Sequence, residues 1–127
     1  MAVIEVNRLT KTYQETLVPV HALNGVDLSF EKGEFAAIVG PSGCGKTTLL
    51  NLIGGLDQPS SGQVIVDGQD ISTLKSAALT DFRLHHIGFV FQSYNLIPVL
   101  TAAENVGFIM SLQKWPKEKR IARTDEL

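Results

Sequence analysis

The residues with the clearest chemistry form the stretch GPSGCGKT, from Gly40 to Thr47, which matches the pattern G-x-x-x-x-G-K-[ST]. Binding of a triphosphate needs several backbone N–H groups that converge on phosphate oxygens, and glycine lets a loop turn tightly with no Cβ in the ligand's way. A helix that begins near Lys46 adds unpaired amides and the positive end of its dipole. The stretch therefore predicts a phosphate loop, with a plain glycine-rich turn as the alternative.

The residues of this phosphate loop have separate expected roles. Lys46 would reach the β- and γ-phosphates, which makes it a catalytic as well as a binding candidate, and the hydroxyl of Thr47 would coordinate Mg²⁺. Cys44 has no activating base in the pattern, so we expect a tolerated small residue rather than a nucleophile. The predicted ligands are ATP and Mg²⁺, and the nucleotide-binding candidates in the loop are Gly40, Pro41, Ser42, Gly43, Cys44, Gly45, Lys46, Thr47 and Thr48.

The elements on either side of the loop are predicted from their apolar patterns. Residues 35–39 are a continuous apolar run, which is typical of a central strand covered on both faces. Leu49, Leu52, Ile53 and Leu56 share one face of a helix, and the pair Gly54 and Gly55 would end it. The order strand, loop and helix is the context in which the motif is meaningful.

Further elements follow along the chain. Alternating apolar residues predict strands around residues 4–6 and 26–30, and Val64 to Val66 running into Asp67 and Gly68 predict a hairpin. A helix is expected over residues 74–82, capped by one of the two preceding hydroxyl residues 72 and 73, and a buried strand over 87–91. Thr101 and Glu104 have the spacing of a capping box, so another helix begins near Thr101 and is broken at residues 115–116. Residues 117–127 are predicted to begin one more helix. Its basic and acidic side chains are interleaved along the sequence, which is typical of a helix surface with salt bridges.

Composition limits the possible functions. The chain has 127 residues, 44% of them hydrophobic, and a formal net charge of -2, which argues against the broad basic surface of a nucleic-acid-binding protein. Its apolar runs are far shorter than the roughly 20 residues that span a bilayer, and no signal peptide is evident. One cysteine cannot form an internal disulfide. We expect a cytoplasmic domain with no direct membrane insertion.

Three stretches in order give the chain a wider resemblance. Lys11 to Tyr13, residues 33–48 with the phosphate loop, and residues 88–92 ending in Gln92 resemble the ATP-binding subunits of ABC transporters. The resemblance implies that Tyr13 stacks on adenine, and that Gln92 is a catalytic residue and a Mg²⁺ ligand that senses the γ-phosphate. An aromatic face and an amide are suited to these tasks.

Other short sequence stretches are similar to those of one group within that family. GGLD from Gly54, GFVFQ from Gly88 and NLIP from Asn95 resemble the lipoprotein-release, macrolide-export and cell-division proteins. This similarity implies a subunit on the cytoplasmic face of the inner (plasma) membrane, held there by a transmembrane permease, and a homodimer in the complete protein. Residues 93–112 would meet a helix of the permease, although an ordinary surface loop and packing helix fit them as well.

The resemblance fixes the expected fold class: an α/β P-loop nucleotide-binding domain of ABC type, whose mixed sheet has an antiparallel portion. Residues 1–127 would be the N-terminal part of one such domain, with an incomplete helical subdomain from about residue 99. The family's Ser-Gly-Gly signature, second acidic strand end and switch histidine do not occur. We therefore expect this stretch to bind MgATP but to hydrolyse it poorly or not at all, and to aggregate through apolar strands at 35–39 and 87–91 that lack neighbours.

Two other functions stay open. One is a non-catalytic nucleotide-binding fragment, and the other is a different P-loop enzyme such as a small-molecule kinase. Asp67 belongs to a hairpin turn rather than to a metal-binding strand end. His21, His85 and His86 lack the spacing of a zinc site, so no metal besides Mg²⁺ is predicted.

Overall fold

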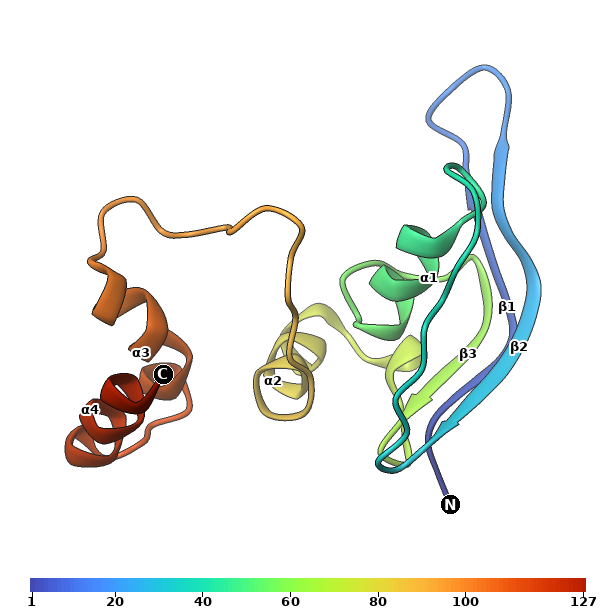
Figure 1. The fold of residues 1–127 in the computed structure, drawn as a ribbon. Coiled ribbons are helices and arrows are strands. Elements are labelled where there is room, and N and C mark those ends of the chain that lie inside the picture. The colour runs from blue at the N-terminus through green and yellow to red at the C-terminus, as the bar shows by residue number, and fades with distance from the viewer. The chain divides into compact units, whose positions relative to one another are not determined.

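The computed structural model describes residues 1–127, which form two compact units, Met1–Leu79 and Thr80–Leu127. The first unit holds the β-sheet and the helix that follows the phosphate loop, and the second holds the C-terminal helices (Figure 1).

The sheet of the first unit is antiparallel throughout. Its strands are β1 (Ala2–Tyr13), β2 (Val20–Glu31), β3 (Ser61–Val66) and β4 (Gln69–Asp70), in the order β2-β1-β3-β4. Val6 of β1 pairs with Leu28 on one side and with Val64 on the other. Asp67 and Gly68 connect β3 to β4 with φ angles of 52° and 79°, the positive values that a two-residue hairpin turn of type I′ requires. The predicted strands near residues 4–6 and 26–30 and the predicted hairpin are confirmed.

Helix α1 (Lys46–Ile53) packs on the sheet and closes the core of the first unit. Leu49 and Leu52 are its buried residues, and Val6, Leu9 and Val64 are buried on the strands. Figure 1 shows α1 beside the face of the sheet. The amide of Gly54 donates to the carbonyl of Leu50 at 2.9 Å as the helix ends, so the predicted helix and its glycine stop are confirmed.

Two of the predicted strands do not form. Residues 35–39 and 87–91 belong to no strand, and several of their side chains are exposed rather than covered: Phe35 is 100% exposed, Val39 86% and Val90 102%. A strand exists only where its N–H and C=O groups bond to a neighbour, and neither segment pairs with another. The α/β class is correct, but the parallel part of the predicted mixed sheet is absent from these 127 residues.

The helix expected after the hairpin is present with a different start. A 3₁₀ turn, η1 (Ile71–Thr73), comes first, and the carboxylate of Asp70 accepts a hydrogen bond from the amide of Ser72 at 3.0 Å. Helix α2 (Ser76–His86) begins only at Ser76. The prediction that Ser72 or Thr73 caps this helix is therefore wrong, because Asp70 draws both residues into the 3₁₀ turn.

The second unit contains helices α3 (Ala102–Leu112) and α4 (Lys117–Glu126). Thr101 Oγ1 accepts from the amide of Glu104 at 3.1 Å, and Glu104 Oε1 accepts from the amide of Thr101 at 3.0 Å, so the predicted capping box is confirmed. Arg123 and Glu126 form an ion pair at 2.7 Å on α4, consistent with the salt-bridged surface expected there. None of the helices combines the length and apolar content needed to cross a membrane.

One side chain ties the loop before α3 to the helix. The side chain of Asn105 accepts from the amide of Ile97 at 2.8 Å and donates to the carbonyls of Ile97, Leu100 and Thr101 at 3.3, 3.3 and 2.9 Å. The loop over residues 97–101 is thus fixed to the first turns of α3.

Candidate functional site

The phosphate loop lies directly before the N-terminus of α1, as its motif predicts. Gly43 and Gly45 have φ angles of 80° and 97°, in the left-handed region that suits glycine. Gly45 is the residue before the first turn of α1, and no side chain caps that turn. The first amides of the helix are therefore left to bind an anion, in a place where the helix dipole favours negative charge.

Lys46 folds back over the loop. Its Nζ donates to the carbonyl oxygens of Gly40 and of Pro41, the latter at 2.7 Å, and lies 3.6 Å from the Sγ of Cys44. Carbonyls are neutral acceptors, and an ammonium group forms stronger hydrogen bonds with a phosphate oxygen. The lysine is thus held at the loop by partners that a phosphate can replace.

Gly45 also sets how closely the loop approaches strand β2. A Cβ at this position would lie 2.5 Å from the carbonyl oxygen of Ala22 and 3.1 Å from the side chain of Leu23. At Gly43, in contrast, a Cβ would meet nothing within 4 Å. The loop is therefore packed against β2 at Gly45 and open at Gly43.

Tyr13, the predicted adenine platform, lies at the end of β1 within the same unit as the phosphate loop. Its hydroxyl donates to Asp57 Oδ2 at 3.3 Å. The Nζ of Lys11 lies 5.1 Å from the centroid of the Tyr13 ring and 3.2 Å from Asp57 Oδ1. Sequence reasoning gave no function to Asp57, because its partners lie 44 and 46 residues away along the chain.

The environment of Asp57 favours its ionised form. Burial raises its pKa, but a backbone amide, the ammonium of Lys11 and the phenol of Tyr13 donate to the carboxylate and leave the pKa below its ordinary value. The carboxylate is therefore charged at neutral pH and keeps accepting the hydrogen bond from Tyr13.

Gln92 belongs to the second unit. It is exposed and lies in a bend after residues 87–91. The first unit holds Tyr13 and residues 40–48, including Thr47 and Thr48 at the start of α1. The roles of Gln92 in catalysis and in Mg²⁺ binding stay predictions.

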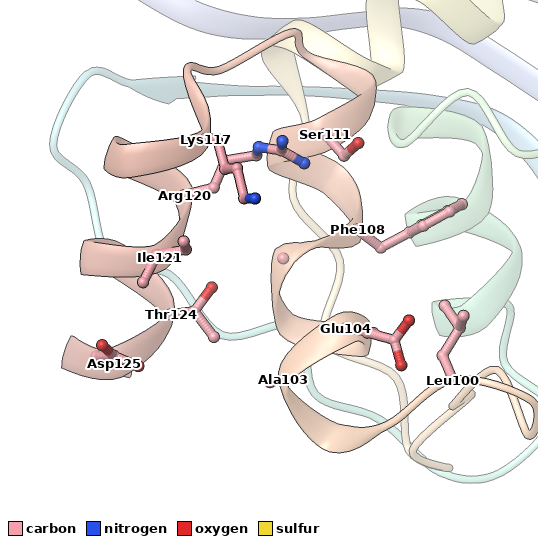
Figure 2. Close-up of a pocket in the computed structure, with 11 residues that line it drawn as sticks. Leu100, Ala103, Glu104, Phe108, Ser111, Lys117, Arg120, Ile121, Thr124 and Asp125 are labelled. Carbon is pink, nitrogen blue, oxygen red and sulfur yellow. The ribbon is translucent and has the colours of Figure 1, made fainter.

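A separate cavity of about 440 Å³ lies between α3 and α4 (Figure 2). Its lining mixes apolar side chains, such as Phe108 and Ile121, with charged ones, such as Glu104 and Arg120. None of the predicted site residues lines it.

Residues 23–126 match the family described as ABC transporter, a range that includes the whole phosphate loop. The lipoprotein-releasing system ATP-binding protein LolD of Syntrophotalea carbinolica is 44% identical over 99% of the chain. The bacitracin export ATP-binding protein BceA of Halalkalibacterium halodurans is 42% identical over 93% of the chain.

The fold is also that of a solved structure. The ATP-binding cassette MJ0796, in a dimeric post-hydrolysis state bound to ADP and Pi, superposes with a TM-score of 0.90 at 42% identity over 97% of the chain. The chain spans about half of each of these proteins: 56% of LolD, 47% of BceA and 54% of the MJ0796 chain.

Proposed function

The chain belongs to the ABC transporter family, and from this premise we propose that it binds MgATP at the phosphate loop as the ATP-binding part of a transporter. The observation that carries the proposal is the uncapped N-terminus of α1 directly behind the loop, with Lys46 folded over it. This arrangement offers amides, a helix dipole and one ammonium to the phosphates.

In this proposal the residues of the loop have separate roles. The amides of residues 43–48 hold phosphate oxygens, and Lys46 exchanges its loop carbonyls for the β- and γ-phosphates. Thr47, exposed in the first turn of α1, offers a hydroxyl oxygen, a ligand type that Mg²⁺ accepts. The ion would supply positive charge that neutralises the charge of the phosphates. Tyr13 would stack on adenine, and Gln92 would be the second protein ligand to the ion.

The names of the relatives supply the biological setting that we propose. LolD is part of a lipoprotein-releasing system and BceA of bacitracin export. We infer that the whole protein pairs with a transmembrane permease on the cytoplasmic side of the membrane, dimerises as the solved cassette does, and couples ATP hydrolysis to release or export. Residues 93–112 would form the contact with the permease.

The first test is calorimetric titration of MgATP into the native chain and into Lys46→Ala. Loss of an ammonium that donates to phosphate should weaken binding by about tenfold or more. Lys75→Ala is the matched control, because Lys75 is an exposed lysine outside the loop. Equal affinity of the native chain and Lys46→Ala for MgATP would contradict the proposed phosphate site.

The second test addresses the partner. A photo-crosslinking amino acid at Tyr94, which is 90% exposed, should attach to a membrane protein in membranes of the source cell. The same group at Asp81 of α2, outside the proposed contact, should not. Equal labelling from both positions would contradict the proposed contact.

A further inference from the structure

A small polar cluster lies beside Tyr13 and outside the phosphate loop. Asp57 accepts from the hydroxyl of Tyr13 at 3.3 Å and pairs with Lys11 at 3.2 Å, while Lys11 also donates to the carbonyl of Gln58 at 2.6 Å. The side chains of Lys11 and Asp57 are 14% and 35% exposed, so water screens this pair less than a pair on the open surface.

We infer that Asp57 is a positioning residue, which fixes the ring of Tyr13 in the orientation that receives the base of the nucleotide. The inference rests on the proposed function, since it needs Tyr13 to contact adenine. It assigns a role in nucleotide affinity to a residue that does not itself touch the nucleotide.

The geometry restrains the ring from two directions. The hydrogen bond from the hydroxyl to Asp57 limits rotation about the Cα–Cβ and Cβ–Cγ bonds of Tyr13. Lys11, held by the same carboxylate, lies over one face of the ring at 5.1 Å from its centroid. A base that stacks on Tyr13 therefore uses the opposite face. Asp57 controls both the angle of the ring and the position of the cation that covers its other side.

The loop that carries Asp57 is itself attached to β1. The amide of Thr12 donates to Ser60 Oγ at 2.9 Å, and the amide of Ser60 donates to the carbonyl of Thr10 at 2.8 Å. The stretch 57–60 follows α1, whose other end begins at the phosphate loop. The cluster thus connects the base platform on β1 to the helix that binds the phosphates.

The test compares two ligands, MgATP and inorganic tripolyphosphate, by calorimetry. An ordered side chain spares the ligand the cost of immobilising it, so Asp57→Ala should weaken MgATP binding by between about twofold and tenfold. Binding of tripolyphosphate, which has no base, should not change. Asp81→Ala is the matched control, because Asp81 is 79% exposed on α2 and lies outside the cluster.

Tyr13→Phe keeps the ring and the Lys11–Asp57 pair but removes the hydroxyl, so it should weaken MgATP binding by no more than Asp57→Ala does. The double variant should bind no more weakly than Asp57→Ala alone, because Asp57→Ala already removes the restraint that the hydroxyl provides. Asp57→Asn still offers an oxygen to the hydroxyl of Tyr13 and should restore most of the affinity.

Three results would overturn the inference. Equal losses for MgATP and tripolyphosphate would mean that Asp57 only supports the fold. Unchanged MgATP affinity in Asp57→Ala, together with a loss in Tyr13→Ala, would mean that the platform works without Asp57. The third result is unchanged MgATP binding in Lys46→Ala. It would contradict the proposed function itself, whereas the first two results would contradict only the role of Asp57.

Discussion

Replacement of Gly45 by alanine is the sharpest test of how the phosphate loop is held. Gly45 has a φ of 97°, and a Cβ would lie 2.5 Å from the carbonyl oxygen of Ala22. That distance would have to grow to at least 3.0 Å before the contact became tolerable. Ala22 belongs to β2, so the loop, the strand or both must move.

Two costs add at this position. A residue other than glycine in a left-handed or otherwise strained conformation costs about 1 to 3 kcal/mol. Forcing extra volume into a packed contact costs about 1 to 3 kcal/mol more. We expect Gly45→Ala to lower the free energy of unfolding by about 2 to 6 kcal/mol, a large share of the roughly 5 to 15 kcal/mol that a domain has.

Gly43 provides the matched control. Its φ is 80°, but a Cβ there would meet nothing within 4 Å. Gly43→Ala should therefore lower the free energy of unfolding only by the cost of the left-handed backbone conformation. Urea unfolding followed by far-ultraviolet circular dichroism gives both free energies. Gly45→Ala should be the less stable variant by about 1 to 3 kcal/mol, which is the contact term alone. A difference below about 0.5 kcal/mol, within the usual range of neutral surface substitutions, would refute the close contact with β2.

Three further predictions follow from the same structure. Alkylation of the exposed Cys44 with a bulky maleimide should block MgATP binding, and prior MgATP should protect the thiol; a modified chain that binds ATP normally would contradict its place in the site. Because the pKa of Asp57 is lowered by folding, its contribution to stability is present above the unfolded value of 3.8 and is lost as pH falls through the lower folded value. Urea unfolding between about pH 5 and pH 2 should therefore show that the free energy of unfolding falls less steeply with acid in Asp57→Asn than in the native chain. Identical pH dependences for the two chains would refute this prediction. The exposed apolar side chains of Phe35 and Val90 should make the chain self-associate on a sizing column, and a cooperatively folded monomer would refute that.

Features that depend on neighbouring residues were predictable from the sequence. The capping box of Thr101 and Glu104 closes within three residues, and the turn at Asp67 and Gly68 depends on the conformations of those two residues alone. The helix that follows the phosphate loop has its apolar face within one short segment. In these cases the pattern contains every group that makes the structure.

Features that depend on distant partners were not predictable in the same way. Residues 35–39 have the composition of a buried strand, but composition cannot show whether a neighbouring strand is there to pair with it. The hydrogen bond between Asp57 and Tyr13 joins residues 44 positions apart in the chain, and a contact of this kind leaves no periodic pattern in the sequence. The strands β1 and β2 are also longer than their alternating stretches, because register shifts along the pair interrupt the period of two.

The hydrogen bonds of Asn105 restrict opening of the loop before α3. One side chain bonds to Ile97, Leu100 and Thr101, so the backbone over 97–101 opens only when the first turns of α3 open. In hydrogen exchange, we expect the Ile97 amide and the N-terminal turns of α3 to open as one cooperative unit. This stretch falls within the proposed permease contact, and its conformational entropy is already lost when the chain folds. A partner that docks there meets an ordered surface, and little further ordering opposes the association.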